Sequence, residues 1–402
     1  MVSRSNASTD LDVVNELLRS TFIASPEAVA SAASLKKIRL ILGLGSVSHN
    51  PRSQKPAPTT DAKARLRQLK PAHLVRESVS IPPVRREFAR YRSDLVLVEW
   101  KHMEKKLEPQ LKYRIDHLAI LLGNVDEKSF HSLRCLGILP KNKAYEPQDD
   151  AYLCYGLVFE LRRLQIDTPV STQPAMATLC DLYARPRKPS LNERRRIGLS
   201  LAETVLHLHT AGWLHKGLRS DNVLYLNLGN FRWEDGTAYG PFLAGYEYAR
   251  PSNADTEKTP ESPELELYRH PLAQGPARSN FNKSFDLFAL GCVLLELALW
   301  RSLKDILSET GLHACNHRIK DESRLSQSGY GRSLEWMQIN EAKARVLQND
   351  QTGGQLADVA FHAGEIFKEV ILLCLYASNN NADDEDLEVQ KLVVEKLKEC
   401  RF

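Results

Sequence analysis

The stretch Trp213-Leu214-His215-Lys216-Gly217-Leu218-Arg219-Ser220-Asp221-Asn222-Val223-Leu224 decides the fold of this chain. Apolar residues stand at both ends and enclose a polar loop, so we expect the ends to pack the loop against a core. One position inside the loop is Gly217, which has no side chain and therefore cannot accept a proton as a general base does. The same short stretch thus carries information about both architecture and chemistry.

Helical patterns surround this loop and continue to the end of the chain. After it, the segment 285–299 is apolar nearly all round, which indicates a helix buried in the middle of a domain. Two amphipathic helices are expected at 357–377 and 386–399. Before the loop, one apolar stripe predicts a helix that stops near Gly212: Ile197, Leu201, Val205 and Leu208.

The region before residue 162 has a different pattern. Leu95 to Lys101 is typical of a β-strand, and a helix is expected from about Pro109 to Leu122. Two further apolar runs, 133–139 and 153–161, indicate two more strands. The sequence therefore predicts an α+β protein, divided into a short helical segment (1–47), a basic linker (48–79), a small β-rich part (80–161) and a large helical part (162–402).

Composition narrows the class of protein. Of the 402 residues, 43% are hydrophobic and 26% are charged, which is ordinary for a soluble globular chain. The seven cysteines form no Cys-x-x-Cys pair, so we expect free thiols in a reducing compartment. The longest apolar run, 287–300, falls short of the roughly 20 residues that span a bilayer. A cytoplasmic protein is expected, and nucleic acid is not an expected partner.

Positive charge is concentrated in one region. Residues 52–92 contain eleven Lys or Arg against three acidic residues, a local charge of +8 in a chain whose net charge is +4. A solvated linker and helix face would explain this composition. Attraction to an anionic membrane or to an acidic partner would explain it as well.

Six motifs resemble those of the protein kinase superfamily, in the order in which kinases have them. The loop within Trp213–Leu224 resembles the catalytic-loop motif H-R-D-L-x-x-x-N, and Val98-Glu99-Trp100-Lys101 resembles the strand motif V-A-I-K. The other four are Leu157–Leu161, Leu243–Arg250, Tyr268–Pro271 and Asp286–Gly291. The resemblance implies a bilobal kinase-like fold: a small β-rich N-lobe with one helix at 80–161, and a large helical C-lobe at 162–402.

The resemblance also implies roles for individual residues. Lys101 would hold the phosphates of ATP, with Asp116 as its best-placed ion-pair partner, ahead of Glu104 and Glu108. Phe159 would be the gatekeeper, and Glu160 would begin the backbone that contacts adenine. Asn222 would be a metal ligand. His215 and Asp286 would have structural roles in the core and in the backbone of the loop.

The chain departs from the kinase pattern where chemistry is done. Gly217 stands at the position of the catalytic aspartate, and Gly245 stands at that of the metal-binding aspartate, with Glu247 as the only nearby substitute. No glycine lies between Gly45 and Gly123, and the bulky stretch Arg85–Arg92 stands where a glycine-rich loop is expected. No catalytic residue is intact. ATP is the cofactor that the resemblance implies. Asn222 would be the one metal ligand of the kinase pattern that remains for Mg²⁺.

The sequence therefore predicts a pseudokinase that acts as a regulatory or interaction module with protein partners. Two alternatives stay open: a slow, unconventional ATP-dependent Ser/Thr kinase, and metal-independent nucleotide binding as a structural switch. Thr259-Pro260 and Ser262-Pro263 could be phosphorylated by proline-directed kinases, and chance Ser/Thr-Pro pairs in a loop are the other reading.

Within the superfamily, three phrases are most similar to fungal kinase-like domains associated with HeLo and prion-inhibition modules. They are Val98–Lys101, Gly212–Leu224 and Gly291–Glu296. This similarity implies a role in non-self recognition or regulated cell death. In such proteins a helical membrane-active domain often precedes the kinase-like part, and the roughly 75 residues that precede it here are too few for a full domain of that kind.

Overall fold

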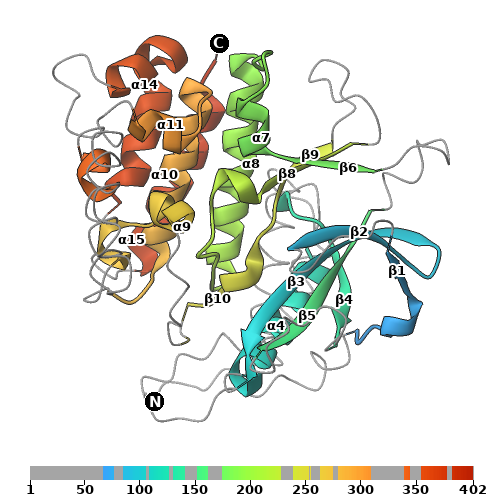
Figure 1. Cartoon of the computed structure of the whole chain (residues 1–402). Coiled ribbons are helices and arrows are strands. Elements are labelled where there is room, and N and C mark those ends of the chain that lie inside the picture. The colour runs from blue at the N-terminus through green and yellow to red at the C-terminus, as the bar shows by residue number, and fades with distance from the viewer. Residues whose placement is uncertain are drawn as a thin grey trace, which may run out of the picture. The chain divides into compact units, whose positions relative to one another are not determined.

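The computed structural model is α+β and contains an antiparallel sheet (Figure 1). It describes residues 67–76, 85–105, 108–125, 130–140, 152–161, 174–227, 239–252, 254, 263–274, 279–308, 339–344, 355–377 and 383–401. The helices expected within 1–47 and the sites Thr259 and Ser262 lie outside the described residues. The chain divides into two compact units. Unit 1 comprises 1–176, 207–213 and 226–253, and unit 2 comprises 177–206, 214–225 and 254–402.

Unit 1 is built on a five-stranded sheet with the order β1-β2-β3-β5-β4. Neighbouring strands are antiparallel throughout. The strands predicted at 95–101, 133–139 and 153–161 are confirmed as β3, β4 and β5. The bounds are β1 (Leu74–Arg76), β2 (Arg86–Tyr91), β3 (Asp94–Glu104), β4 (Cys135–Leu139) and β5 (Tyr152–Glu160).

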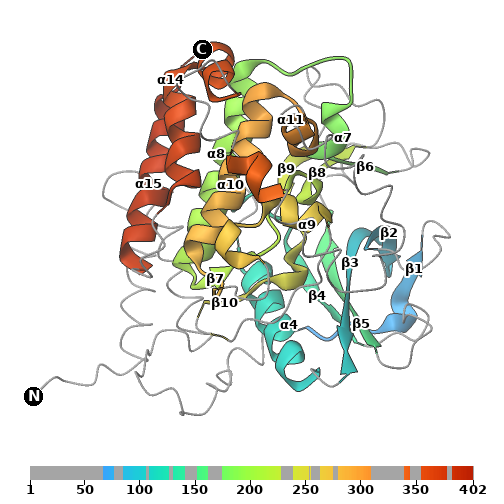
Figure 2. The same cartoon turned by 60° about the vertical axis from the view of Figure 1, so that its left-hand side comes forward.

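One face of this sheet is crossed by a strap, which we define as residues 67–73, ending in the short helix η1 (Pro71–His73) (Figure 2). The strap starts at the β4 edge, where Gln68 forms a parallel bridge with Ile138, and it runs into β1 at the other edge. Beneath it lies an apolar cluster against which Leu69 and Leu74 pack. The strap-side cluster consists of Ala89, Val96, Val98, Trp100, Leu139, Cys154 and Val158.

A glycine permits the strap to come this close to β4. A Cβ atom on Gly137 would lie 2.2 Å from the carbonyl oxygen of Arg67, and its φ of +152° is one that L side chains rarely adopt. The backbone N–H groups of Ile138 and Leu69 donate across the same contact, to Arg67 O at 3.0 Å and to Ile138 O at 2.8 Å. The strap is therefore joined to the sheet by backbone pairing as well as by apolar burial.

Strand β1 corrects one prediction. Part of the predicted linker 48–79 belongs to the sheet, because residues 74–76 form β1 and pair with β2. The stretch Arg86–Tyr91, which stands where a glycine-rich loop is expected, is a strand paired on both sides. Pairing with distant strands gives these polar residues an ordered partner for their backbone groups, which local composition does not predict.

Alternation along β3 and β5 directs a second set of side chains to the face opposite the strap, including the buried Leu97, Leu157 and Phe159. The helix α4 (Glu108–Gly123) packs on β4 and β3. Its buried stripe contains Ile115 and Leu118. The helix predicted at about 109–122 is thereby confirmed.

Unit 2 is organised around α10 (Lys283–Leu299), which confirms the buried helix predicted at 285–299. Asn282 caps its start by accepting a hydrogen bond from the N–H of Phe285. The helix α14 (Gln355–Leu375) lies along α10, and Gly291 permits the contact, since a Cβ there would be 2.9 Å from Cys374 Cβ. The other helices are α7 (Leu179–Tyr183), α8 (Leu191–Thr210), α9 (Pro263–Tyr268), α11 (Leu303–Leu307) and α15 (Asp383–Glu399).

Short strands and turns complete the described chain. One small sheet has the order β6-β8-β9 and another pairs β10 with β7. Their bounds are β6 (Ala175–Thr178), β7 (Trp213–Leu214), β8 (Val223–Asn227), β9 (Tyr239–Leu243) and β10 (Arg250–Pro251). Three single turns of 3₁₀ helix are η4 (Ser220–Asn222), η5 (Tyr246–Tyr248) and η6 (Pro271–Ala273).

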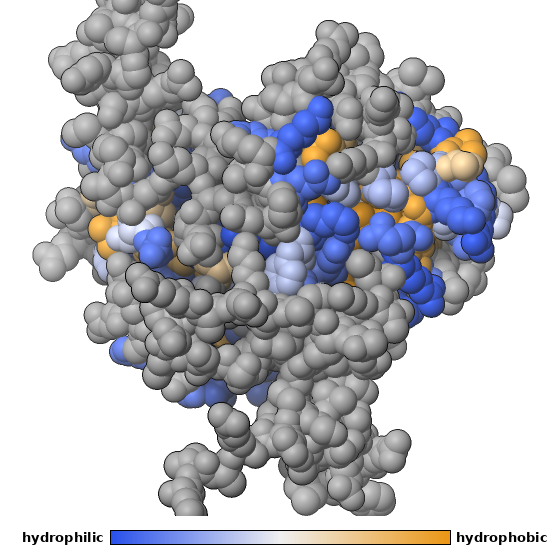
Figure 3. Space-filling model, turned by 90° about the horizontal axis from the view of Figure 1, so that it is seen from below, coloured by the Kyte–Doolittle hydropathy of each residue, from blue (hydrophilic) through white to orange (hydrophobic). Residues whose placement is uncertain are grey.

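The described surface is mainly polar in the view from below (Figure 3). Large apolar side chains that remain exposed include Val75 on β1, Phe361 and Ile366 on α14, and Leu392 on α15. Among the helices that the structure describes, none combines the length and apolar character needed to cross a membrane.

Candidate functional site

The loop that decides the fold joins β7 to β8 through η4, and it is held by a carboxylate from α10. Asp286 is fully buried and accepts hydrogen bonds from the backbone N–H groups of His215, at 2.7 Å, and Lys216, at 2.8 Å. Lys216 has a φ of +63°, a left-handed conformation that costs an L residue roughly 1–2 kcal/mol. Asp286 therefore holds the backbone of the loop through both of its oxygens and stabilises this strained turn.

Gly217 sits in the middle of a closed set of local hydrogen bonds. Its N–H donates to Nδ1 of His215 at 3.2 Å, and its carbonyl oxygen accepts from the side-chain amide of Asn222 at 2.6 Å. His215 is completely buried, and its Nδ1 serves the backbone as an acceptor. Both side chains that flank Gly217 therefore support the backbone of the loop, and position 217 itself carries no side-chain oxygen.

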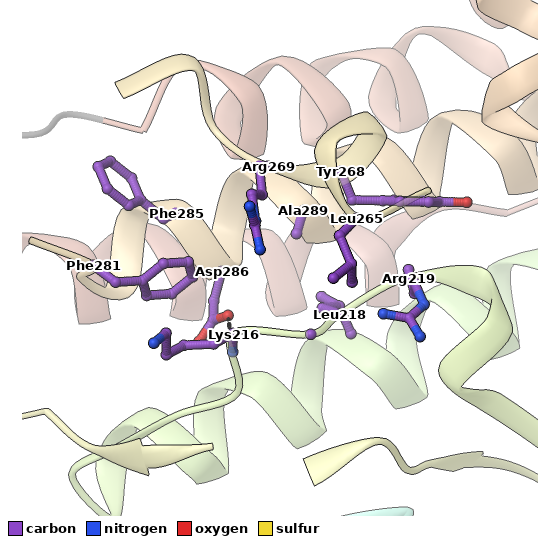
Figure 4. A pocket seen from close by; sticks show the side chains of 11 residues that line it. Lys216, Leu218, Arg219, Leu265, Tyr268, Arg269, Phe281, Phe285, Asp286 and Ala289 are labelled. Atoms are coloured by element: carbon purple, nitrogen blue, oxygen red, sulfur yellow. Dashed lines mark hydrogen bonds between the residues drawn. The ribbon is translucent and has the colours of Figure 1, made fainter. Parts of the chain in front are cut away.

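A small hollow, partly open to solvent, lies between this loop, α9 and α10 (Figure 4). Three cationic side chains line it, and each has a partner within unit 2. The Nζ atom of Lys216 lies 5.6 Å from the ring centre of Phe281, and Arg219 Nε lies 3.6 Å from Asp221. Arg269 forms an ion pair with a glutamate of α9. The two arginines of the hollow thus have carboxylate partners, whereas Lys216 lies over an aromatic ring.

A buried carboxyl group ties this loop to the helices behind it. Oε1 of Glu296, on α10, accepts hydrogen bonds from the hydroxyl of Tyr268 at 2.7 Å, the N–H of Leu303 at 2.6 Å and the hydroxyl of Ser220 at 3.3 Å. Burial raises the pKa of Glu296 to about 8, although the three donors lower it. At neutral pH this side chain is therefore mainly protonated.

In unit 1, the segment that contains Gly245 is fixed to the residues before β4. The N–H of Leu243 donates to His131 O at 2.8 Å, the hydroxyl of Ser132 donates to Leu243 O at 3.0 Å, and the hydroxyl of Tyr246 donates to Ser132 Oγ at 2.9 Å. Gly245 itself has a φ of +79°, which glycine adopts without strain. The segment is thus an ordered turn without a carboxylate at position 245.

Replacing Tyr246 by phenylalanine tests this attachment. The change removes one buried hydrogen bond and leaves Ser132 without the donated proton, so we expect the free energy of unfolding to fall by about 1 kcal/mol. Urea denaturation followed by tryptophan fluorescence measures the change. Tyr91→Phe, on the strap side, is the matched control, because the Tyr91 hydroxyl accepts one exposed backbone N–H at 3.2 Å. Equal losses in the two variants would contradict the interpretation.

Lys101 is accompanied on its strand by a buried ion pair. Because side chains alternate along β3, Glu99 and Lys101 lie on the same face of the sheet. Glu99 is directly opposite Arg86 of β2, with Nη2 of the arginine 3.3 Å from Oε1 of the glutamate. Both side chains are nearly buried, 11% exposed for the arginine and 8% for the glutamate. The face that carries Lys101 therefore also carries an internally paired carboxylate.

The protonation of Glu99 is governed by its burial and by its neighbours. Burial raises the pKa of Glu99, and the negative charge of Glu247 raises it further, whereas Arg86 and the backbone N–H of Gly245 lower it. Glu99 therefore connects β2 and β3 to the segment around Gly245 within unit 1. This connection places two carboxylates, Glu99 and Glu247, on the side of the sheet where Lys101 lies.

The acidic partners expected for Lys101 have other contacts. Both carboxylate oxygens of Asp116 lie 2.8 Å from Lys112 Nζ, one turn earlier in α4. Oε1 of Glu108 accepts a hydrogen bond from the hydroxyl of Tyr155 at 2.9 Å. Asp116 is therefore paired within its own helix, where the i, i+4 spacing makes the local contact easy to form.

The two residues predicted for the adenine side of the site lie at the end of β5. Phe159 is 3% exposed and packs in the sheet opposite Leu97 and Cys135. Glu160 ends the strand with its carboxylate 3.9 Å from Arg134 Nη1. Both are thus positioned by β5, in unit 1, whereas Asn222 belongs to the loop of unit 2.

Sequence reasoning missed Arg86, Ser132 and the role of Glu99. A charged residue within an apolar strand was the available signal for Glu99, while the spacing of Arg86 and Ser132 gives none. Within the residues that the structure describes, no group of three or more His, Cys, Asp or Glu side chains is arranged to hold a metal ion. No protein-family model matches this sequence, and no curated protein matches it.

Proposed function

We propose that this chain is a protein-kinase-like module that does not transfer phosphate and acts instead through binding to other proteins. The observation that carries the proposal is the lack of a side chain at Gly217, inside a loop whose backbone is held by hydrogen bonds to Asp286 and Asn222. A hydroxyl acceptor would find no general base there, and losing a general base typically costs 10²–10⁴-fold in rate. A loop that keeps its backbone hydrogen bonds to Asp286 and Asn222 but lacks its base supports a role in architecture.

The residues present do not fit a magnesium–nucleotide complex. Mg²⁺ prefers carboxylate and phosphate oxygens in octahedral geometry, and position 245 offers no side-chain oxygen. Asn222 would supply one neutral oxygen, and its amide nitrogen is already bonded to Gly217 O. Glu247 lies near Glu99 and would oppose the negative charge of phosphates beside Lys101, whereas Glu99 is already paired with Arg86.

A binding role is supported by what the described chain retains. The networks around Asp286 and Glu296 fix the loop and the ends of α9 and α10, so this part of unit 2 has one defined shape to present. A context of fungal non-self recognition or cell death rests on the sequence similarity alone. Protein partners, and an acidic partner or anionic membrane for the basic segment 52–92, belong to the same proposal.

Phosphoryl transfer from radiolabelled ATP to generic protein substrates, with Mg²⁺ or Mn²⁺, tests the proposal. We expect the purified full chain and its Lys101→Met variant to give the same background. Transfer by the wild-type chain that Lys101→Met abolishes would overturn the proposal and favour the slow Ser/Thr kinase. Including Lys112→Met as a control separates loss of a specific lysine from loss of positive charge, since Lys112 pairs with Asp116.

Restoring the two missing carboxylates is expected to leave the chain inactive. In the double variant Gly217→Asp/Gly245→Asp, the backbone at position 245 must keep a φ near +79°, which strains an aspartate more than a glycine. The Arg86–Glu99 pair also remains in place. The same assay should therefore detect only the background level of phosphoryl transfer. Near-UV circular dichroism shows whether the variant is folded. Measurable transfer would mean that these two positions alone had silenced the chemistry.

A further inference from the structure

We propose that the Arg86–Glu99 ion pair is the internal occupant of the place where a nucleotide would lie against Lys101, so that this chain excludes nucleotide with its own side chains. The inference rests on the proposed function, because that function is what makes Lys101 the counterpart of a phosphate-binding lysine. It goes further by naming the two residues that close the site and by predicting that removing them opens it.

The strand motif shows what has changed. In V-A-I-K an alanine stands two residues before the lysine, and alternation directs both side chains to the same face of the sheet. In this chain the small, apolar alanine is replaced by Glu99. A ligand that reached Lys101 along this face would meet a longer side chain and a carboxylate. A flat aromatic base would lose that space, and Glu247, the second carboxylate near Glu99, would repel phosphates.

The register of β2 and β3 supplies the other half of the occupant. Arg86 is the residue directly opposite Glu99 on the adjacent strand, so its guanidinium lies next to the carboxylate. The two side chains are 11% and 8% exposed, which means that they have been withdrawn from water together. Neither can swing away cheaply, because the one left behind would be a buried and unpaired charge.

The pair is also attached to the segment around Gly245. The backbone N–H of Gly245 donates toward Glu99, and Glu247 is close enough to influence its protonation. This segment is itself bonded to His131 and Ser132. The occupant is therefore held from two directions within unit 1, by strand pairing and by an ordered turn, as a bound ligand would be.

A second ion pair on the same sheet provides an internal comparison. Arg76 and Glu87 lie 2.8 Å apart, but Glu87 also accepts a hydrogen bond at 2.8 Å from the indole N–H of Trp100, a member of the strap-side cluster. Glu87 and Arg86 are adjacent in β2 and so point to opposite faces. The Arg76–Glu87 pair thus stabilises the strap side, and it should have no influence on ligands near Lys101.

The test compares two double variants of the full chain. Arg86→Val/Glu99→Ala removes the occupant, whereas Arg76→Ala/Glu87→Gln removes the ion pair of the other face and keeps an acceptor for Trp100. Isothermal titration and thermal melting with ATP, ADP and adenosine, each with Mg²⁺ and with EDTA, measure binding. We expect nucleotide to bind Arg86→Val/Glu99→Ala at least about tenfold more tightly than it binds the wild type or the control.

The inference would be overturned by a folded Arg86→Val/Glu99→Ala that binds nucleotide no more tightly than the wild-type chain does. If that variant does not fold, Arg86→Thr/Glu99→Ser replaces the pair by a cross-strand hydroxyl pair suited to β-strands, and the same comparison applies.

Phosphoryl transfer by the same proteins separates this inference from the proposed function. If the wild type binds nucleotide but does not transfer phosphate, the inference about the internal occupant is wrong and the proposed function still holds. Transfer by the wild type that depends on Lys101 would overturn the proposed function itself.

Discussion

Replacing Arg86 by methionine is expected to lower the free energy of unfolding by about 3–5 kcal/mol at pH 7.5. The methionine fills similar space but leaves Glu99 buried without its cation, 6% exposed and beside a second carboxylate. The loss should shrink as the pH falls. A lone buried carboxyl group has a raised pKa, so protonation at mildly acidic pH removes the uncompensated charge.

Urea denaturation of wild type and Arg86→Met at several pH values measures this effect. The double variant Arg86→Met/Glu99→Leu should recover most of the stability, because a well-packed apolar pair can replace a buried ion pair at little cost. Arg134→Met is the matched control. Arg134 is 54% exposed and lies 3.9 Å from Glu160, so its loss should cost no more than about 1 kcal/mol. An equally small loss in Arg86→Met would show that the pair is solvated.

The contribution of Glu296 to the stability of the wild-type chain is expected to fall as the pH rises from about 5 to about 8. The pKa of this side chain is about 8 in the folded chain, against an ordinary value of 4.5. At this one group, the folded chain therefore holds up to one more proton than the unfolded chain over this range. The resulting stabilisation is complete below pH 4.5 and is lost as the pH rises through 8, by on the order of 4 kcal/mol.

Comparison with Glu296→Gln isolates this contribution. Glutamine keeps an oxygen for Tyr268, Ser220 and the N–H of Leu303 but does not ionise. We expect the difference in unfolding free energy between the two proteins to change steadily over this pH range, in favour of the variant at high pH. A difference that stayed constant with pH would contradict a raised pKa at Glu296. Glu203→Gln is the control, because Glu203 is partly exposed and pairs with Lys398. Its unfolding free energy should change with pH as that of the wild type does.

The sequence predicted those elements whose apolar pattern is long and local. The helix α10 is buried on nearly every side, and its run of apolar residues is typical of an interior helix. Likewise β3 and α4 lie close to their expected positions. The sequence did not predict the strap, because its partner Ile138 is distant in the sequence. It did not predict β1, because the partner strand β2 is equally polar. Only the pairing itself gives Leu69 and Leu74 an apolar face to cover.

Some features of the candidate site can likewise be predicted from the sequence, and others cannot. An absent side chain is visible in the sequence, so the lack of a side-chain oxygen at Gly217 follows directly from the loop motif. The contact between Arg86 and Glu99 is not visible, because it depends on which residues of β2 and β3 face each other. A shift of register by one residue would send Arg86 to the strap side. Cross-strand partners of this kind require the three-dimensional structure.

The strap also determines where the chain can be cut ahead of the five-stranded sheet. A recombinant fragment starting at residue 80, the boundary that the sequence suggests, would lack β1 and the strap residues that pack against the cluster containing Trp100 and Leu139. Its bared apolar surface and unpaired β2 edge would invite aggregation during expression. Fragments that start at or before Arg67 retain this cover and are the ones to choose for purification.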